Sequence, residues 1–330
     1  MKTVVWTKYG GPEGLKVKEV EKPIPKDNEI LIKIHATTAM AGDCEIRRLE
    51  FPFYLQIPLR FYFGLFKPKR VKILGQELAG EVVEVGKNVS QFKKGDKVFA
   101  ALGFGFGAYA EYISLPEQRD DEVIAPKPTN MSYEEAAVML VGGLNALHFL
   151  HQVDIQKGQK ILINGAGGSI GTVAIQLAKS FGAEVTAVDS TTKLEMLRAI
   201  GADQVIDYTQ EDFTKSDEKY DIIFDVVGKA PFRRSIQSLT KKGVYLLGNP
   251  ALLRSIRGRW VSMTTSKKIV GGTASYNLDD LLKLKELIEA GKIKAVIDKR
   301  FPLEKTAEAH EYIENGHKKG NVVITVVKEK

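Results

Sequence analysis

The sequence predicts an α/β protein with two parts, a doubly wound parallel sheet and a β-rich, barrel-like domain. Three observations support this prediction. Residues 160–189 contain an apolar run, a glycine-rich turn, a segment with helical spacing of apolar residues and a second apolar run. Strand and helix patterns continue to alternate up to about residue 290, as in parallel sheets. Residues 1–128 contain many short strand patterns punctuated by glycine and proline, which favours a barrel.

The glycine-rich turn joins a predicted strand, residues 160–164, to a predicted helix that ends before Gly182. Ala166, Gly168 and Gly171 have the spacing A-x-G-x-x-G within it. Small residues let a pyrophosphate approach the backbone, and the first N–H groups of a helix attract an anion. The predicted cofactor contacts of the turn are Ala166, Gly167, Gly168, Ser169, Ile170 and Gly171.

The strand that follows this helix, residues 183–188, ends at Asp189. A carboxylate at this place in such units accepts hydrogen bonds from ribose hydroxyls. We therefore interpret residues 160–189 as a dinucleotide-binding unit. The alternative is a tight turn between strand and helix that binds nothing.

Length, charge and cysteine content limit the possible classes of protein. A chain of 330 residues can form two domains, each with its own core. The net charge of +7 comes from 48 basic and 41 acidic residues mixed along the chain, which fits a basic soluble enzyme better than a protein that binds nucleic acid or an anionic membrane. The single cysteine, Cys44, fits a reducing compartment. With no signal-peptide pattern and no apolar run of transmembrane length, the expected location is cytoplasmic.

The change in pattern near residue 130 marks the expected domain boundary. We expect residues 1–128 to form the first domain and residues 129–291 the second, with Ser132 as a helix N-cap. The first domain is expected to be completed by about residues 292–330, because residues 320–326 predict a terminal strand that rejoins it.

Several short motifs occur in a definite order along nearly the whole chain. They are GQELAG at 75–80 with VG at 85–86, KGDKV at 94–98, GAYAEY at 107–112, the glycine-rich turn, IGAD at 200–203, FDVVG at 224–228 and AGKI at 290–293. Together they resemble the medium-chain dehydrogenases/reductases, and within them the zinc-independent quinone oxidoreductase branch that includes zeta-crystallin. The resemblance implies a GroES-like catalytic domain, a Rossmann cofactor domain and a cleft between them.

The same resemblance predicts that no zinc is bound. Gln76 stands where zinc-dependent relatives have a histidine ligand, and Met40 stands where they have a cysteine. Cys44 is one residue past Asp43 and is out of register. A catalytic zinc needs three protein ligands. Without this Lewis acid, reduction of a quinone or an activated enone or enal is favoured over alcohol oxidation, with the protein mainly positioning the cofactor and a small hydrophobic electrophile.

The resemblance also implies candidate catalytic residues. Asp43 and Arg47 match a D-x-x-x-R pattern that follows the active-site asparagine of relatives, which is Met40 here. They are therefore either catalytic or a structural ion pair that orients the loop. Asn145 takes the usual threonine position of a GLTA-like motif at residues 143–146 and is expected near the nicotinamide.

The residues that would select the cofactor conflict. Asp189 favours NAD(H), because a carboxylate repels a 2′-phosphate. Ser190, Lys193 and Tyr208 match positions that hold this phosphate in NADPH-dependent quinone reductases. We therefore expect NADP(H), with NAD(H) possible. The other predicted cofactor contacts are Val227 and Gly248.

Two stretches depart from the family. Residues 51–66 are rich in aromatics and are followed by basic residues up to 72, and residues 252–261 repeat the mixture. Three interpretations stay open: loop packing, a hydrophobic substrate mouth, or contact with an anionic membrane or nucleic acid.

The sequence as a whole predicts a zinc-free, NAD(P)H-dependent reductase of quinones or activated enones. The alternatives are a non-catalytic NADPH-binding protein that contacts RNA or membrane, and a zinc-free alcohol dehydrogenase. Relatives commonly dimerise by joining edge strands, so a homodimer through residues 268–271 is expected.

Overall fold

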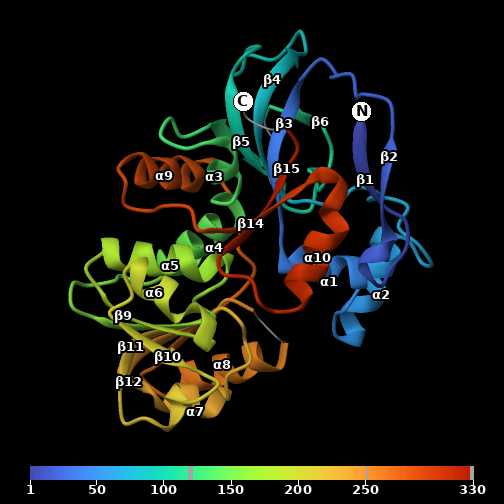
Figure 1. Ribbon diagram of the computed structural model, residues 1–330. Helices are drawn as coiled ribbons and strands as arrows, with labels where there is room; N and C mark the ends of the chain where they lie inside the picture. The colour runs from blue at the N-terminus through green and yellow to red at the C-terminus, as the bar shows by residue number, and fades with distance from the viewer. Residues whose placement is uncertain (118–121, 250–251, 328–330) are drawn as a thin grey trace. The chain divides into compact units, whose positions relative to one another are not determined.

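The computed structural model describes residues 1–117, 122–249 and 252–327 (Figure 1). The chain forms two compact units. The first unit comprises Met1–Val141, Tyr276–Glu289 and Ala295–Lys330, and the second comprises Gly142–Ser275 and Ala290–Lys294. The first unit therefore takes in segments from both ends of the sequence.

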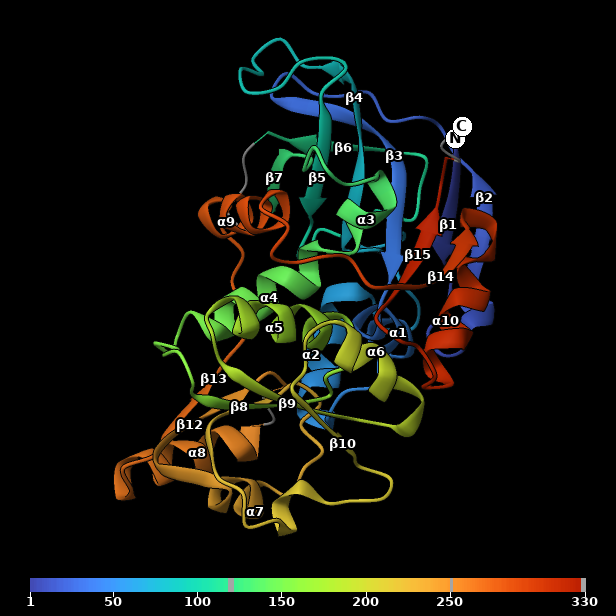
Figure 2. The same ribbon diagram turned by 60° about the vertical axis from the view of Figure 1, so that its left-hand side comes forward.

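The second unit is built on a six-stranded sheet in which every neighbouring pair of strands is parallel. Its strands are β8 (Lys160–Asn164), β9 (Glu184–Asp189), β10 (Gln204–Asp207), β11 (Tyr220–Asp225), β12 (Leu239–Leu247) and β13 (Lys268–Gly271). The associated helices are α4 (Leu140–Leu150), α5 (Ser169–Ser180), α6 (Leu194–Ala199), α7 (Phe232–Gln237) and α8 (Leu252–Thr264). Figures 1 and 2 both show α5 and α6 on one face of the sheet and α7 and α8 on the other.

The strand order is β10-β9-β8-β11-β12-β13. It corresponds to the order 3-2-1-4-5-6 of the doubly wound dinucleotide-binding fold. The winding reverses between β8 and β11, so the carboxyl ends of these two strands flank the point at which such sheets bind ligands. The central strand β8 is apolar throughout its middle and fully buried at Ile161, Leu162 and Ile163, as expected for a strand covered on both faces.

The first unit contains a seven-stranded sheet and a separate two-stranded one. In the larger sheet the order is β14-β15-β3-β4-β5-β7, and β6 pairs with β3. The strands of the unit are β1 (Lys2–Trp6), β2 (Leu15–Glu19), β3 (Glu29–Ala39), β4 (Glu77–Val85), β5 (Lys97–Ala101), β6 (Tyr112–Pro116), β7 (Val123–Pro126), β14 (Ile297–Pro302) and β15 (Asn321–Thr325). Its helices are α1 (Ala41–Arg48), α2 (Phe53–Phe63), α3 (Tyr133–Ala137), α9 (Leu278–Glu289) and α10 (Thr306–Glu314).

The two ends of the chain meet in the larger sheet. β15 pairs antiparallel with β3, with Val323 opposite Thr38, and parallel with β14. One apolar core fills the space between β3, β4 and β5 and includes Ile32, Leu78 and Val98. Packing of the last strand against β3 therefore fixes the C-terminal segment to the N-terminal part of the sequence.

The N-cap expected at Ser132 is present. Its hydroxyl accepts a hydrogen bond from the backbone N–H of Glu135, and the Glu135 carboxylate accepts one from the backbone N–H of Ser132. This reciprocal capping box satisfies two donors at the start of α3.

The aromatic stretch forms a helix, α2, which begins after Pro52 and contains Pro58. Loop packing explains only part of its composition. Phe63 is fully buried and makes edge-on ring contacts with Trp6, whereas Phe53 and Phe61 are exposed. Within the described part of the chain, α2 and the other helices are too short or too polar to cross a bilayer.

Candidate functional site

The turn after β8 brings the start of α5 to the point where the sheet reverses its winding. Gly165 has a φ of +86°, and a Cβ there would lie 2.2 Å from Cγ2 of Val227. Only glycine fits such a backbone without strain. Gly168 is the N-cap of α5. The first N–H groups of this helix have no carbonyl partner within it and lie at its positive dipole end.

The three glycines around this helix start differ in what surrounds them. A Cβ on Gly171 would lie 2.5 Å from the carbonyl oxygens of Gly165 and Ala166, and one on Gly167 would lie 2.5 Å from Cδ of Lys193. A Cβ on Gly168 would meet only the carbonyl oxygen of Gly165, at 3.7 Å. Gly171 and Gly167 therefore permit close packing, whereas Gly168 leaves open space at the helix start. This cradle fits the pyrophosphate of a dinucleotide.

The Asp189 carboxylate, at the end of β9, is occupied by groups of the protein itself. Oδ2 accepts a hydrogen bond from the backbone N–H of Gly167 at 2.7 Å, and Oδ1 accepts one from that of Ser190 at 2.8 Å. Nζ of Lys193 lies 2.9 Å from Oδ1, and both side chains of this ion pair are largely buried. The negative charge of Asp189 is therefore compensated locally.

The residues expected to select the cofactor lie together. Asp189 and Asp207 are partners in the pairing of β9 with β10, and the backbone N–H of Tyr208 donates to the carbonyl of Asp189. Ser190 precedes the short 3₁₀ helix that ends at Lys193. A hydroxyl, an ammonium and an exposed phenol therefore gather at the carboxyl ends of two adjacent strands.

A second buried carboxylate, Asp225, lies on the other side of the switch point and was not predicted from the sequence. Its Oδ1 accepts hydrogen bonds from Asn164 Nδ2 and from the backbone N–H of Gly228, both at 2.9 Å. Its Oδ2 accepts one from Tyr245 Oη at 2.7 Å, and Arg254 Nη1 lies at 3.4 Å. Burial and the neighbouring carboxylate raise the pKa of Tyr245. The signal was available, since an aspartate directly ended an apolar strand.

These contacts hold the end of β11 against the end of β8. Val227 follows β11 and packs on Gly165, and the backbone N–H of Gly248, which follows β12, donates to the Asp225 carbonyl. Of the two remaining predicted cofactor contacts, Val227 thus lies beside the glycine-rich turn and Gly248 lies beside the end of β11. Asn145 lies on α4 and is half-buried.

A buried polar cluster surrounds Asp43 in the first unit. The Asp43 carboxylate accepts hydrogen bonds from the backbone N–H of Met40 at 3.1 Å, from Tyr109 Oη at 3.0 Å and from Gln76 Nε2 at 3.3 Å. The two residues at expected zinc-ligand positions, Met40 and Gln76, therefore both lie against this carboxylate. Burial raises the pKa of Asp43 to about 6, although the hydrogen bonds oppose the shift.

Arg47 belongs to the same cluster but is not the ion-pair partner of Asp43. Its guanidinium pairs with Glu314 and donates from Nε to His310 Nδ1 at 3.3 Å. Burial lowers the pKa of His310 to about 3, so this ring is neutral at physiological pH, and its Nε2 lies 3.0 Å from Tyr109 Oη. The alternative of a structural pair between Asp43 and Arg47 is therefore wrong, because the loop is held by Glu314 and His310 of α10.

The comparisons with known proteins agree with this architecture. The family model of the alcohol dehydrogenase GroES-like domain matches residues 26–128, and that of the zinc-binding dehydrogenases matches residues 200–324. The NADPH-dependent alkenal/one oxidoreductase, chloroplastic, of Arabidopsis thaliana is 33% identical over 98% of this chain and 79% of its own length.

Two solved structures resemble the whole chain. The quinone oxidoreductase from Coxiella burnetii has a TM-score of 0.86 and 30% identity, with 99% of both chains covered. The Escherichia coli quinone oxidoreductase complexed with NADPH has a TM-score of 0.82 and 25% identity, with 99% of this chain and 100% of that chain covered.

A doubly wound parallel sheet with a glycine-rich turn, in one chain with a GroES-like domain, defines the two-domain dehydrogenase class. The chain belongs to the medium-chain dehydrogenase/reductase superfamily and, within it, to the quinone oxidoreductase branch. The predicted fold class is thereby confirmed.

Substitutions of Gly171 and Gly168 are predicted to affect different properties, the first mainly stability and the second mainly cofactor binding. Gly171→Ala should lower the free energy of unfolding by about 1–3 kcal/mol, because its Cβ overlaps two carbonyl oxygens. Gly168→Val should cost only about 1 kcal/mol, as a poor N-cap, but weaken NADPH binding at least tenfold, about 1.4 kcal/mol. Urea denaturation and calorimetry measure the two effects. A folded Gly168→Val protein with unchanged NADPH affinity would contradict the assignment of the turn.

Asp43→Asn is predicted to change the pH dependence of stability. Because the folded pKa of about 6 exceeds the ordinary value of 3.8, Asp43 contributes stability that is complete below about pH 4 and is lost as the pH rises through 6. The free energy of unfolding of the variant minus that of the wild type should therefore rise over this range, by up to about 3 kcal/mol. Urea titrations at each pH measure the difference.

Two other buried groups have shifted pKa values close to this pH range. Burial raises the pKa of Glu77 to about 7 and lowers that of His310 to about 3. Both are present in wild type and variant, so to first order their contributions cancel in the difference. A difference that stays flat or falls between pH 4 and 6 would show that the Asp43 charge is not penalised by burial.

Proposed function

We propose that this protein is an oxidoreductase that transfers a hydride from NAD(P)H to a quinone or to an activated enone or enal. The observation that carries the proposal is the open cradle at Gly168, where the start of α5 meets the carboxyl ends of β8 and β9. The relatives named NADPH-dependent alkenal/one oxidoreductase and quinone oxidoreductase support the reaction class.

The chain's own residues supply binding and orientation. The first N–H groups of α5 would hold the pyrophosphate, and Asp189 with Lys193 would face the adenosine ribose. The loop after β11, held by Asp225, would support the cofactor from the other side of the switch point. When bound, the nicotinamide supplies the hydride.

NADP(H) is the favoured cofactor in this proposal. The ion pair to Lys193 and two backbone donors compensate the Asp189 charge, which otherwise would repel a 2′-phosphate. Ser190 and Tyr208 add a hydroxyl and a phenol at the same strand ends. An NADPH-dependent relative and a similar structure complexed with NADPH support this preference.

We propose further that the reaction proceeds without zinc. Met40 and Gln76, which stand at the expected ligand positions, pack around Asp43 and offer neither a thiolate nor an imidazole. Cys44 is buried, and burial raises the pKa of its thiol to about 12, which disfavours the thiolate that zinc requires. Metal analysis of the purified protein tests this proposal, and one bound zinc per chain would contradict it.

An electrophilic acceptor suits such a site. Hydride addition to the carbon of a quinone or conjugated carbonyl gives a delocalised anion, so hydrogen bonding and positioning can replace a Lewis acid. The buried cluster of Asp43, Tyr109 and His310 would act by fixing α1 rather than by touching the acceptor.

We also propose a homodimer. β13 is the outermost strand of the six-stranded sheet and pairs there with β12, and an open strand edge offers backbone groups to a second copy. A monomer mass by light scattering at micromolar concentration would argue against it.

Acceptor-dependent oxidation of NADPH tests the reaction class. A panel of quinones, enones, enals and simple alcohols is offered with NADPH, NADH or the oxidised cofactors. Turnover is expected with the quinones or the activated carbonyls and not with the alcohols. Cofactor binding without turnover of any acceptor would favour the non-catalytic alternative, and oxidation of alcohols would favour an alcohol dehydrogenase.

Lys193→Ala is predicted to weaken the binding of NADPH but not that of NADH. The change removes a charge-assisted contact to the 2′-phosphate and the only ammonium that pairs with Asp189 among the described residues, so NADPH should bind roughly 10- to 100-fold more weakly. NADH has no phosphate there and should be little affected. Dissociation constants of both cofactors for both proteins measure the effect.

Lys179→Ala is the matched control, because Lys179 also forms a lysine–aspartate ion pair in this unit, with Asp203 at 2.8 Å. It should leave both cofactor affinities unchanged. If Lys193→Ala weakens both cofactors alike, or neither, the phosphate pocket is misplaced and Asp189 makes this an NADH enzyme.

A further inference from the structure

The inward face of α8 is fixed to the second unit at three points one turn apart. Arg254 contacts Asp225, and a Cβ on Gly258 would lie 2.6 Å from Cγ2 of Ile269, so the helix passes close to β13. Ser262 Oγ accepts a hydrogen bond from the backbone N–H of Ile269 at 2.9 Å. Because these positions recur at i, i+4 and i+8, they define one side of the helix. The orientation of α8 about its axis is therefore set.

The opposite side of α8 carries large apolar side chains. Ile256 is 58% exposed, Trp260 is 67% exposed and Met263 is 78% exposed. Their spacing of i, i+4 and i+7 places them on one face. We call these three residues the α8 stripe. Such a continuous apolar face of a helix, as opposed to single exposed residues, marks a contact surface.

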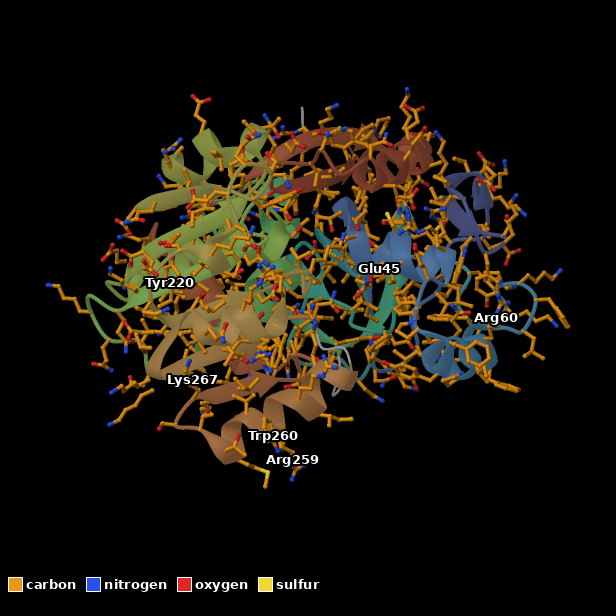
Figure 3. All side chains as sticks on the ribbon, turned by 90° about the horizontal axis from the view of Figure 1, so that it is seen from below. Glu45, Arg60, Tyr220, Arg259, Trp260 and Lys267 are labelled. Carbon is orange, nitrogen blue, oxygen red and sulfur yellow. The ribbon has the colours of Figure 1, made fainter. Side chains whose placement is uncertain are left out.

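Arginines border the stripe on both sides. Arg257 and Arg259 are exposed, and neither forms an ion pair with a residue that the structure describes. Trp260 and Arg259 are labelled on α8 in Figure 3. The segment 252–264 contains no acidic residue. A partner must therefore offer apolar surface in the centre and negative charge on both flanks.

We propose that α8 docks on the surface of an anionic lipid bilayer. The helix would lie in the plane of the interface, with the stripe among the acyl chains near the headgroups and the arginines on lipid phosphates. Tryptophan is suited to this depth because its ring is apolar and its N–H is polar. This inference does not depend on the proposed reaction.

The charge pattern disfavours a second copy of this helix as the occupant. Stripe-to-stripe packing would bring Arg257 and Arg259 close to their own copies, and α8 has no carboxylate to compensate them. Nucleic acid would satisfy the arginines but would leave Ile256 and Met263 without an apolar partner. A bilayer surface satisfies both.

The fluorescence of Trp260 provides a probe for this proposal. Of its two tryptophans, Trp6 is 1% exposed and Trp260 is 67% exposed. The full-length protein is mixed with vesicles of phosphatidylcholine alone or with phosphatidylglycerol added. With the anionic vesicles only, the emission should shift to the blue, and acrylamide should quench it less.

Two double variants that keep Trp260 test the two components. Arg257→Gln with Arg259→Gln should weaken binding to the anionic vesicles roughly thirtyfold, since each basic residue near such a surface contributes about a factor of five. Ile256→Ser with Met263→Ser should weaken it at least about tenfold by removing apolar burial. Co-sedimentation measures both. Because all four side chains are exposed, the variants should unfold at the wild-type urea concentration.

Lys241→Gln with Lys242→Gln, at exposed positions of β12, is the control for charge, and Ile24→Ser, at 83% exposure, is the control for apolar surface. Both should bind like wild type. Vesicle binding without a Trp260 shift would overturn the proposal and point to another surface, such as α2. An equal shift with neutral vesicles would also overturn it, as would a shift that depends on protein concentration in the absence of vesicles. A salt-sensitive complex with RNA, without binding to vesicles, would overturn it as well.

Discussion

The candidate site depends on the close approach of α5 to the turn after β8. A Cβ at Gly171 would overlap the carbonyl oxygens of Gly165 and Ala166, so the helix can start at the switch point only because this residue is glycine. Once the helix start is placed there, neighbouring groups are determined in turn. The backbone N–H of Gly167 reaches Asp189 at the end of β9, and Val227 after β11 packs against Gly165. Steric exclusion at one glycine thus organises three strand ends.

Each unit contains a buried carboxylate that links several of its own elements, and the surrounding donors decide how far its desolvation is offset. Asp225 has four partners and links β8, β11, β12 and α8. Asp43 has donors from the residues just before α1 and β4 and from the segment before β6, yet burial still raises its pKa. A buried carboxylate stabilises an arrangement only where its hydrogen bonds offset desolvation. Removing a donor would therefore deprive a buried carboxylate oxygen of a hydrogen bond that offsets its desolvation.

The sequence predicts those parts of the structure that depend on local periodicity and on glycine. The parallel strands, the turn around Gly168 and the strand end at Asp189 were all predicted. The cluster of Arg47, His310 and Glu314 was not, because Arg47 lies more than 260 residues from the other two and no local pattern indicates such a contact. The helix α2 was missed because Pro58 is a helix breaker by propensity, and tertiary packing of Phe63 overrides it. The α8 stripe has helical spacing in the sequence, but Gly258, which lies between Ile256 and Trp260 in the chain and disfavours a helix, obscured the pattern.

In the proposed cofactor site, the surroundings of Asp189 would favour NADP(H) over NAD(H). A carboxylate has about four lone-pair sites, and Gly167, Ser190 and Lys193 take three of them. The Ser190 hydroxyl also lies 3.5 Å from Oδ1, so a ribose hydroxyl of NADH would find less acceptor capacity here than a free carboxylate offers. A 2′-phosphate, in contrast, would bring roughly two negative charges to a place where the local carboxylate is already neutralised and an ammonium and a hydroxyl lie adjacent. In the proposed site, the ion pair between Lys193 and Asp189 would therefore make a residue typical of NAD(H) sites compatible with NADP(H).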